Sequence, residues 1–505
     1  MSLYDSWSVY LVTAVAIVSA WMYYYKHLAY RYWAKKNVPQ LTPDYPFAAL
    51  IRMLTGKASI PQMMNRGYED FKKTGYGGVY AGKPALVVCN PELIKHVLTK
   101  DFNNFQDHGM PYDTENDPLS ANLFNLSGHR WKMLRSKLSP TFTSGKIKGM
   151  FPLVHECVQQ LLECLREECK KNNGSVEMQD LLLRYCADVI GSCAFGISCN
   201  SLKNPDSEFQ HMGREMLTTG SKTFLQFFIA RNFPGLRKYV TTRRLFPKTS
   251  AFFTGLMEHT VTHRRENNIE RNDFVQLMMQ IADEETDEKF FNKDIMTAQA
   301  TIFFIAGLDN VGNQLGFCLH AMAANPDLQE RVHKEITSVL ADFDGKMCYE
   351  AVKKMDLVSR VFDESMRIHT PLGAIMRVAT SDKYMIPGTA LVIDKGTPII
   401  IPLLKIHMDE EYFPNPEKFD PDRFTEEEKA KRHPYTYMPF GEGPRFCIAS
   451  RFAKLEMHLC FAELVRHFKF DVAPETDLSL KLATNTIGPS PKNKFWLKVT
   501  ERAPQ

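Results

Sequence analysis

The sequence predicts a mainly α-helical protein with small β-sheets, which follow a hydrophobic N-terminal helix. Apolar residues recur at helical spacing over long stretches, such as residues 149–169, 292–324, 327–340 and 354–368. Shorter runs have the composition of β-strands, at residues 78–88, 390–393 and 398–401. No long Ser/Gly linker, repeat or low-complexity block interrupts the chain from residue 47 to residue 500, so we expect a single compact unit there.

Composition and charge narrow the class of protein. With 505 residues, of which 44% are hydrophobic, the chain can bury a large core. Its net charge of +4, from 62 basic and 58 acidic residues, gives no case for nucleic-acid binding. Its 11 cysteines are odd in number and include no Cys-x-x-Cys pair, so neither a zinc site nor a disulfide framework is indicated. We expect reduced thiols on a domain that faces the cytosol.

Residues 6–25 form an uncharged apolar run with aromatic residues at both ends. About 20 such residues cross roughly 30 Å of hydrocarbon, so the run predicts a transmembrane helix. Basic residues follow within residues 26–36 and only Asp5 precedes the run, which places its C-terminal side in the cytosol. A cleaved signal peptide is the alternative, because Val18-Ser-Ala20 is a usable cleavage site. No positively charged segment precedes the run, however, and the apolar stretch continues past that site.

These features divide the chain into three expected regions. We expect an uncleaved transmembrane anchor in residues 1–25, a basic, proline-containing hinge in residues 26–46 and a globular domain in residues 47–505. Pro43 and Pro46 belong to the hinge, because prolines interrupt regular structure.

A cysteine near the C-terminus lies in the loop Phe-Gly-Glu-Gly-Pro-Arg-Phe-Cys-Ile-Ala, residues 440–449. The apolar pattern of residues 448–465 predicts a helix, with Cys447 in the loop just before its start. A helix N-terminus lowers a thiol pKa and holds a thiolate. Gly443 lets the backbone approach a flat partner closely. The guanidinium of Arg445 is suited to pair with a carboxylate. A thiolate, a flat face and a carboxylate partner together describe iron protoporphyrin held by cysteine. The alternative is a turn around a buried structural cysteine.

The pattern Phe-x-x-Gly-x-Arg-x-Cys resembles the haem-binding loop of the cytochrome P-450 superfamily, the haem-thiolate monooxygenases. The segment from Ser139 to Lys146 is similar to microsomal, xenobiotic-metabolising animal members. The resemblance implies a single, mainly helical haem-thiolate fold behind the anchor, with haem b between a long central helix and the cysteine loop. Cys447 is then the iron ligand, and Phe440 and Gly443 contact the haem. Ala449 stands where the family usually has glycine. Its extra methyl group should leave less space at the haem contact without preventing that contact.

Other positions agree with this resemblance. Glu364 and Arg367 are three residues apart and share one helix face, which by itself is most often a surface pair. The resemblance implies that Arg423 closes on the same glutamate, which would make it a buried carboxylate between two arginines. It also implies a set of donors for the haem propionates, namely Trp131, Arg135, Arg377 and Arg445.

The long apolar helix expected around residues 301–317 contains one acid, Asp309. An acid in such a run rarely lacks a partner or a role, and oxygen activation needs delivered protons. Ala306 and Gly307 are small and leave room for dioxygen. The family usually has threonine after the acid, whereas this chain has Asn310. An amide can orient water but does not pass a proton as a hydroxyl does, so coupling should be poor unless water replaces the hydroxyl. Alternatively, Asn310 faces the helix and has no catalytic role.

The resemblance implies a monooxygenase of the endoplasmic reticulum membrane that inserts one oxygen atom from O2 into apolar small molecules, mostly xenobiotics. Electrons would come from NADPH through a flavoprotein NADPH–cytochrome reductase, with cytochrome b5 as a further partner. The docking candidates are basic residues, namely Lys132, Lys137, Arg451 and Lys454, with a weaker group at Lys429, Lys431 and Arg432. Substrate contacts are expected by family position, although many would serve equally well in a core, at Phe105, Leu123, Phe303, Phe304, Ala374, Ile375 and Ile487.

Two other functions stay open on the sequence alone. The first is an oxygen-independent haem-thiolate isomerase or dehydratase of lipid hydroperoxides, which the missing threonine suggests. The second is a non-catalytic haem protein that binds a ligand. The complete anchor and the basic residues near the cysteine favour the monooxygenase.

Overall fold

In a computed structural model, the chain forms two compact units. The structure describes residues 3–42, 51–52, 55, 59–80, 83–217, 229–230, 234–271, 273–284, 291–484, 486 and 488–503. Unit 1 comprises Met1–Gly109 with Gly373–Lys405, and unit 2 comprises Met110–Leu372 with Ile406–Gln505. The chain therefore crosses between the units without a linker, which is why composition predicted a single compact unit after residue 46. The limits of the expected anchor and hinge, at residues 25 and 46, stay a prediction. Pro43, Pro46 and Ile487 lie outside the described residues.

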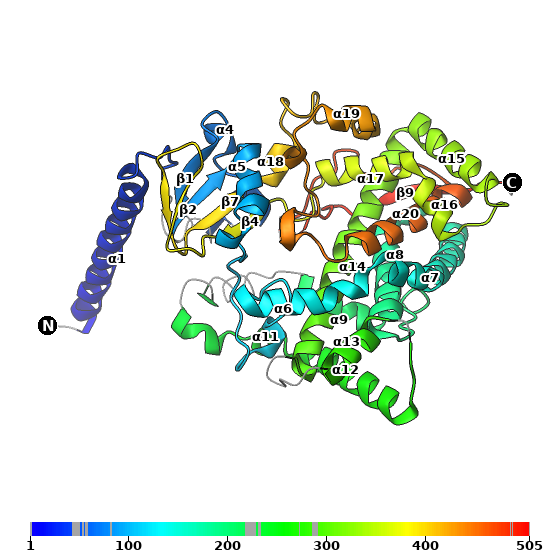
Figure 1. Cartoon of the computed structure of the whole chain (residues 1–505), viewed down its shortest axis with the longest axis horizontal. Helices are drawn as coiled ribbons and strands as arrows, with labels where there is room; N and C mark the ends of the chain where they lie inside the picture. Colours follow the sequence, from blue (N-terminus) through cyan, green and yellow to red (C-terminus); the bar gives the residue numbers. More distant parts are fainter. Residues whose placement is uncertain are drawn as a thin grey trace. The chain divides into compact units, whose positions relative to one another are not determined.

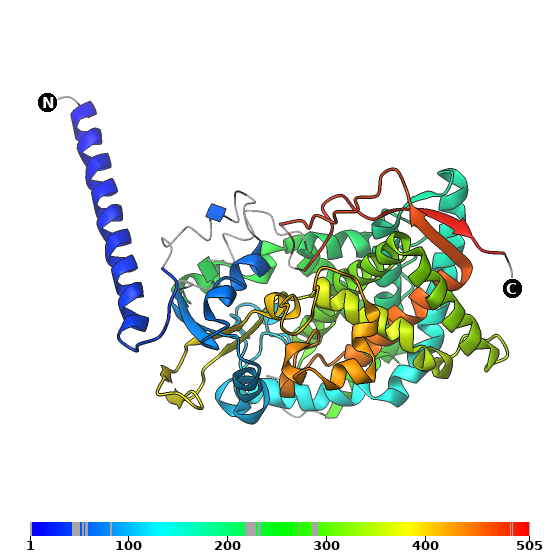
Figure 2. The ribbon, with the colours of Figure 1, turned by 90° about the horizontal axis from the view of Figure 1, so that it is seen from above.

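Unit 1 begins with α1 (Leu3–Ala34), one uninterrupted helix (Figures 1 and 2). Its last turn is fixed to the sheet of unit 1, because Trp33 is 1% exposed and its Nε1 donates to the Val79 carbonyl at 3.1 Å. A Cβ at Gly78 would lie 2.3 Å from the Trp33 ring, so the strand beneath this indole needs glycine. Shorter helices and helical turns complete the unit, namely α3 (Ile60–Met64), α4 (Tyr68–Phe71), α5 (Pro91–Lys95), η1 (His96–Lys100) and η2 (Phe102–Asn104).

The main sheet of unit 1 has the strand order β1-β2-β7-β4. The predicted run 78–88 is wrong as a single strand: it contains parts of two antiparallel strands, β1 (Tyr76–Tyr80) and β2 (Pro84–Val88). Proline is tolerated at the first position of a strand, and the apolar composition continues on both sides of the turn, so the pattern looked continuous. β2 runs parallel to β7 (Pro398–Ile401), whose bounds match the prediction.

Three other strands of unit 1 follow Gly373. β4 (Ile375–Val378) is antiparallel to β7 and carries Arg377. The predicted run 390–393 overlaps β6 (Val392–Asp394), which pairs with β5 (Lys383–Met385) in a separate two-stranded sheet. Helix α18 (Leu403–His407) begins at the end of unit 1 and ends in unit 2.

Unit 2 is built around α14 (Lys293–Ala324), a 32-residue helix that contacts α8 (Met178–Ile190), α12 (Pro247–Asn267) and α20 (Ser450–His467) (Figure 1). Asn292 caps its first turn by accepting from the Ile295 N–H at 3.1 Å. Its apolar residues are buried on nearly all sides, as expected for a core helix.

The remaining helical elements of unit 2 surround this core. The other long predicted helices are α7 (Ser144–Lys171), α15 (Pro326–Ala341) and α17 (Asp356–Ile368). The shorter elements are η3 (Pro118–Ser120), α6 (Gly128–Leu138), η4 (Ser139–Phe142), η5 (Gly191–Phe195), α9 (Glu208–Leu217), η6 (Pro234–Tyr239), α11 (Thr242–Leu245), α13 (Phe274–Glu284), α16 (Tyr349–Lys354), η7 (Pro421–Phe424), α19 (Glu426–Ala430), η8 (Pro434–Thr436) and η9 (Gly443–Arg445). A three-stranded antiparallel sheet, in the order β3-β9-β8, joins Ser175–Glu177, Trp496–Glu501 and Phe468–Val472.

Length and hydropathy alone select α14 as the one helix of the described residues able to cross a bilayer. Of its most apolar window, 61% is buried inside the protein, so its hydropathy is that of a core helix. The described side chains in the apolar run of α1 are instead exposed, for example Val12 (68%) and Ile17 (64%). The anchor function of α1 stays a prediction.

Candidate functional site

The Cys447 loop is a tight turn between η9 and α20. The Cys447 N–H donates to the Phe440 carbonyl at 2.9 Å, which closes the loop on itself. Gly443 has φ of 73°, a left-handed conformation that favours glycine. Helix α20 starts at Ser450, so Cys447 lies in the loop just before the helix, as predicted.

The electrostatics of Cys447 differ in part from the prediction. Burial raises the pKa of the Cys447 thiol, while the Ala449 N–H, which bonds to the sulfur, and the charge of Arg135 act in the opposite direction. The N–H group near the helix start therefore lowers the pKa as predicted, but burial, which the sequence did not report, outweighs it. A buried thiolate needs a further positive charge, and a metal ion supplies one. The chemistry of this position thus fits an iron ligand.

Arg445 and Trp131 stack beside the cysteine loop. The Arg445 guanidinium lies 4.0 Å from the Trp131 ring centroid, in cation–π geometry, and the side chain is 8% exposed. Arg445 Nη2 donates to the Leu126 carbonyl at 2.7 Å. Arg135 lies on α6 with Trp131, and burial lowers its pKa, with the Cys447 sulfur acting in the opposite direction. The structure therefore places three of the four predicted propionate donors in unit 2 around Cys447.

The fourth predicted donor, Arg377, lies on β4 of unit 1. It is 2% exposed, its Nη1 donates to the Met376 carbonyl at 2.8 Å, and its Nε has no partner. Burial lowers the pKa of Arg377 to about 10. No carboxylate among the described residues forms an ion pair with it. A buried guanidinium in this state suits a ligand that brings its own carboxylate, as a haem propionate does.

Glu364, Arg367 and Arg423 meet in the interior of unit 2. Arg367 donates to both oxygens of Glu364, at 2.7 and 2.9 Å, and both side chains are 0% exposed. Arg423 Nε lies 3.4 Å from Glu364 Oε1, and the Asp420 N–H donates to the same oxygen at 2.8 Å. The carboxylate thus joins α17 to the segment around η7, and the surface-pair alternative does not apply.

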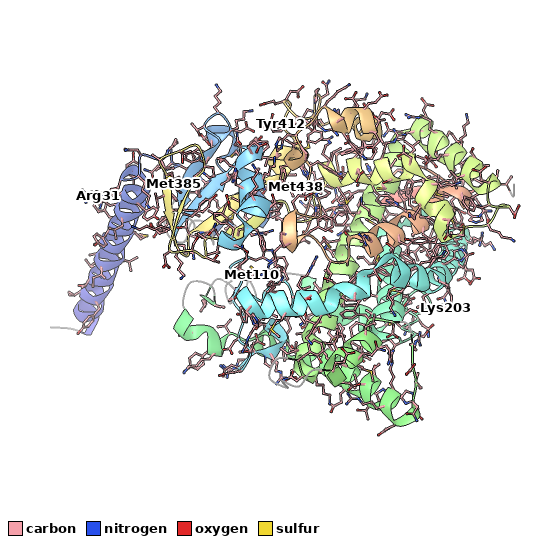
Figure 3. All side chains as sticks on the ribbon, in the orientation of Figure 1. Arg31, Met110, Lys203, Met385, Tyr412 and Met438 are labelled. Carbon is pink, nitrogen blue, oxygen red and sulfur yellow. The ribbon has the colours of Figure 1, made fainter. Side chains whose placement is uncertain are left out.

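Both arginines also donate to backbone carbonyls of residues 407–416, contacts that sequence reasoning missed. Arg367 donates to the His407 and Pro416 carbonyls at 2.9 and 2.6 Å, and Arg423 donates to the Pro414 carbonyl at 2.5 Å. His407 Nε2 then accepts from the backbone N–H of Met438, labelled in Figure 3, at 3.1 Å. The Glu364 cluster is therefore connected through His407 to the start of the cysteine loop.

Asp309 lies on α14 and is largely buried. Burial raises its pKa to about 6, while the Asn313 Nδ2, which donates to Asp309 Oδ1 at 2.8 Å, acts in the opposite direction. Sequence reasoning missed Asn313, although its position four residues later on the same helix was an available signal. Gln179 Nε2 in turn donates to Asn313 Oδ1 at 3.0 Å. One oxygen of the carboxyl group is therefore held by a hydrogen bond, and the raised pKa brings the protonation equilibrium of the group closer to neutral pH.

The small residues and the amide beside Asp309 have local roles. Asn310 Nδ2 donates to the Ala306 carbonyl of its own helix at 2.8 Å. A Cβ at Gly307 would lie 2.9 Å from Ile190 Cδ1, so the glycine is needed where α14 packs against α8. Ala306 is exposed on the same turn. The structure thus gives Gly307 a packing role that sequence reasoning had not assigned.

The predicted substrate residues divide into packed and less packed positions. Phe304 is 0% exposed and contacts the rings of Phe209 and Phe253, with centroids 4.6 and 5.0 Å away. In unit 1, Phe105 is 0% exposed with its ring against Tyr384. For these two, core packing is the better interpretation. Phe303 is half-buried, and the others are 6–7% exposed, namely Leu123, Ala374 and Ile375.

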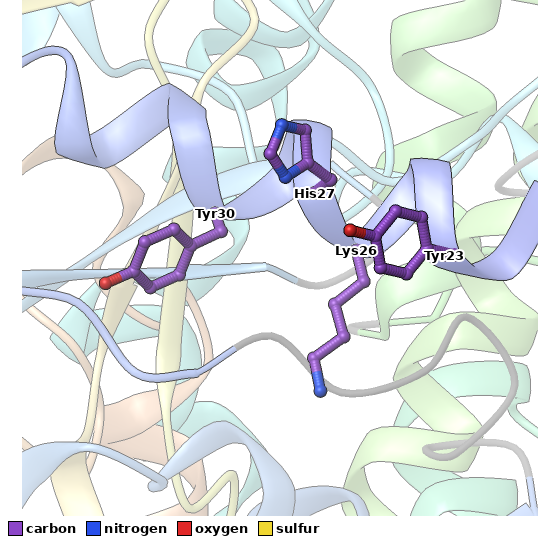
Figure 4. Close-up of a pocket in the computed structure, with 4 residues that line it drawn as sticks. All are labelled: Tyr23, Lys26, His27 and Tyr30. Atoms are coloured by element: carbon purple, nitrogen blue, oxygen red, sulfur yellow. The ribbon is translucent and has the colours of Figure 1, made fainter.

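One shallow surface hollow lies elsewhere, on α1 (Figure 4). Its lining consists of Tyr23, Lys26, His27 and Tyr30, which recur on one helix face. Tyr23 and His27 stack with ring centroids 6.3 Å apart. These side chains are mostly exposed, so the hollow is the outer face of a helix.

Comparison with known proteins identifies the family of this chain. A family model described as cytochrome P450 matches residues 43–498. Cytochrome P450 9e2 of Blattella germanica is 38% identical over 503 residues, which cover 94% of each chain. Probable cytochrome P450 6a14 of Drosophila melanogaster is 37% identical over 97% of this chain and 99% of its own length. Cytochrome P450 6A1 of Musca domestica is 35% identical over 97% of each chain. The family binds haem b, and this class receives NADPH electrons through a reductase. With a family model over most of its length and relatives at this identity, the chain belongs to the cytochrome P450 family of haem-dependent monooxygenases.

Proposed function

We propose that this chain is a membrane-anchored monooxygenase that inserts one atom of dioxygen into apolar small molecules of foreign origin. The observation that carries the proposal is the half-buried Cys447 loop, with Arg445 stacked on Trp131 and Arg135 nearby. The monooxygenase class follows from family membership. The substrate class is supported by the similarity of residues 139–146 to xenobiotic-metabolising members and by the aromatic side chains around Phe303, whose ring lies 4.5 Å from that of Phe274.

In this proposal the Cys447 thiolate ligates the haem iron, and Phe440 and Gly443 face the porphyrin. Trp131, Arg135 and Arg445 donate to the propionates, a role for which the buried guanidinium of Arg377 is also suited. When bound, the haem supplies the redox chemistry that activates dioxygen, with thiolate ligation favouring O–O cleavage.

Protons are the part of the reaction that this chain's own residues supply. Asp309 is suited to hold and release a proton, because burial brings its pKa to about 6. Asn313 keeps the carboxyl group in one orientation through its hydrogen bond to Oδ1. The Asn310 amide donates to the Ala306 carbonyl, so in this conformation it orients neighbouring groups and transfers no proton.

The same amide supports a second candidate function. A haem-thiolate isomerase or dehydratase of lipid hydroperoxides does not activate dioxygen, so it needs no protons delivered to dioxygen. An Asn310 that is hydrogen-bonded to its own helix, in place of threonine, suits such an enzyme. The basic residues expected to dock a reductase favour the monooxygenase.

Those basic residues differ in how well they suit docking. Lys132 and Arg451 are exposed, whereas Lys137 and Lys454 are half-buried, with the Lys454 ammonium 5.7 Å from the Phe440 ring centroid. Lys429 and Lys431 already pair with acids three residues earlier, Glu426 and Glu428, at 3.1 and 2.5 Å. Arg432 is half-buried, with its guanidinium 4.8 Å from the Phe413 ring centroid. The group at Lys132, Lys137, Arg451 and Lys454 is therefore the better docking surface for a flavoprotein reductase, and for cytochrome b5 as a further partner.

Attachment to the endoplasmic reticulum membrane is proposed through α1. Its apolar side chains from Val9 to Val18 that the structure describes are 48–69% exposed, and soluble proteins rarely expose such a band. Basic residues follow on the C-terminal side, so unit 2 and the rest of unit 1 lie in the cytosol.

The proposed function is tested with purified protein, a flavoprotein reductase, NADPH and a panel of apolar compounds under isotopically labelled dioxygen. We expect NADPH-dependent product that contains one labelled oxygen atom, and we expect Cys447→Ser to abolish both this product and the carbon monoxide difference band of cysteine-ligated haem. Cys348→Ser, at a half-buried free thiol, is the control and should keep both. Turnover of a hydroperoxide without NADPH would instead establish the isomerase, and ligand-induced spectra without any turnover would establish a binding protein.

Removing one partner of the Glu364 cluster should prevent stable haem incorporation. Glu364→Gln or Arg367→Ala leaves a buried charge without its partner, at a cost of ~3–5 kcal/mol. We expect little or no haem in the purified variant, measured as haem per polypeptide. The control is Glu350→Gln, which removes an exposed pair with Lys148 and should leave haem content and stability nearly unchanged. Normal haem content in both Glu364 and Arg367 variants would contradict the role of the cluster.

The coupling of NADPH oxidation to product should depend on the charge of Asp309. Because its pKa is about 6, the carboxyl group holds a proton to donate below that pH and loses it as the pH rises through about 6. We expect the ratio of product to NADPH consumed to fall over that range. Asn313→Ala removes the bond that stabilises the carboxylate, so the fall should move to higher pH. Asp309→Asn should flatten the profile, and an unchanged profile in that variant would exclude Asp309 as the donor.

Charge reversal should separate the docking surface from other basic residues. Lys132→Glu with Lys137→Glu should raise the apparent KM for the reductase several-fold at low salt, and the difference should shrink as salt screens the charges. Lys429→Glu with Lys431→Glu is the matched control, because those lysines already pair with glutamates. Equal effects from both pairs, or none from the first, would refute this docking surface.

A further inference from the structure

Residues 121–126 are an irregular segment of unit 2 that is hydrogen-bonded on two sides. The segment follows η3 and precedes α6, and its only regular feature is a turn in which Asn122 Oδ1 accepts from the Phe124 and Asn125 N–H groups, each at 3.1 Å. Ala121, Leu123 and Leu126 are 0–7% exposed. A buried segment without helix or strand depends on side chains for its remaining backbone bonds.

Gln299 of α14 provides these bonds on one side. Its side chain is 0% exposed. The Leu123 N–H donates to Gln299 Oε1 at 2.7 Å, while Gln299 Nε2 donates to the Ala121 carbonyl at 3.1 Å and to the Ile295 carbonyl of its own helix at 3.1 Å. The amide thus pairs with the segment as a neighbouring strand would, and all but one of its hydrogen-bonding positions are used.

Arg445 of the cysteine loop holds the opposite side. Its Nη1 donates to the Leu123 carbonyl at 3.3 Å and its Nη2 to the Leu126 carbonyl at 2.7 Å. Leu123 is therefore bonded through its N–H to the central helix and through its C=O to the arginine beside Cys447. A shift of this residue alters both contacts.

We propose that Gln299 is a positioning residue for substrate binding: it holds Leu123 at the substrate region and, through Leu123, keeps Arg445 in place. The inference rests on the proposed function, which assigns Leu123 to the substrate region and Arg445 to a propionate. Gln299 is too deeply buried to contact substrate itself, so it acts through the backbone of residues 121–126. Loss of the amide leaves the Leu123 N–H and the Ala121 C=O without partners in a buried setting, and the segment gains alternative positions.

The experiment compares two buried glutamines of the same chain. Gln329 is also 0% exposed and also clamps a backbone, because it accepts from the Phe470 N–H at 2.8 Å and donates to the Phe470 carbonyl at 2.7 Å. Gln299→Met and Gln329→Met each replace the amide with an apolar side chain of similar length and should destabilise the holoprotein to a similar extent. Only the first should affect residues 121–126.

We measure hydrogen exchange of the peptide that covers residues 119–127 and the dissociation constant of apolar compounds from their spectral shift. In Gln299→Met we expect exchange of that peptide to quicken at least tenfold and affinity to weaken by about tenfold, with KM rising more than kcat falls. Gln329→Met should leave both readouts at the wild-type values. Should Gln299→Met not accumulate, Gln299→Asn, whose shorter amide does not reach both backbone groups, is expected to act in the same direction.

Two outcomes overturn the inference. Wild-type exchange and affinity in the Gln299 variants would show that the amide does not position the segment, and equal changes in Gln329→Met would show a general loss of stability. The proposed function fails separately, when wild-type protein with intact haem gives no spectral shift with any apolar compound. In that case the exchange comparison still decides whether Gln299 holds residues 121–126.

Discussion

The carboxylate of Glu364 is the interaction on which the rest of unit 2 depends. It lies in the interior with two guanidinium groups and one backbone N–H around it, so its charge is compensated only while α17 and the segment around η7 stay together. The same arginines donate to carbonyls that lead to His407, and His407 accepts from the chain just before the cysteine loop. Because the charges of the cluster are desolvated, separating them is costly. The cysteine loop, which has no long helix or strand of its own, is therefore attached to a support that stays in place.

Each unit holds one group whose charged form burial disfavours. In unit 2 burial raises the pKa of the Cys447 thiol, and in unit 1 burial lowers the pKa of Arg377, so each group needs an opposite charge to remain ionised. In the proposed function, the positive iron of the haem compensates the Cys447 thiolate, so the folding of unit 2 and haem binding are linked.

The sequence predicted those features that follow from periodicity or short spacing. The bounds of α14 and β7 were nearly correct because apolar pattern decides them, and the pair of Glu364 with Arg367 follows from helix geometry. The hairpin of β1 and β2 was missed although the Gly-Lys-Pro of residues 82–84 is a turn signal between the two apolar runs. Gln299 was missed for a different reason: a buried amide that bonds to a distant backbone has no sequence period, and its partners are 176 to 178 positions away. The thiol pKa of Cys447 depends on tertiary burial, which no local motif reports.

The polar side chains of α14 bear on the proton transfer that the family usually assigns to a threonine, in whose place this chain has Asn310. Thr297 and Thr301 donate their hydroxyl protons to backbone carbonyls four residues earlier. The amides are used in the same way: Gln299 binds residues 121–123, Asn310 binds its own helix and Asn313 holds Asp309. Hydroxyls and amides whose protons are committed to fixed acceptors orient structure and do not exchange protons with a reacting group. Among the polar side chains from Thr297 to Gln314, all of which the structure describes, Asp309 is then the one whose pKa permits proton exchange near neutral pH. In the proposed function, proton delivery therefore depends on the Asp309 carboxyl group and water, and the contacts of Asp309 determine its efficiency more than residue 310 does.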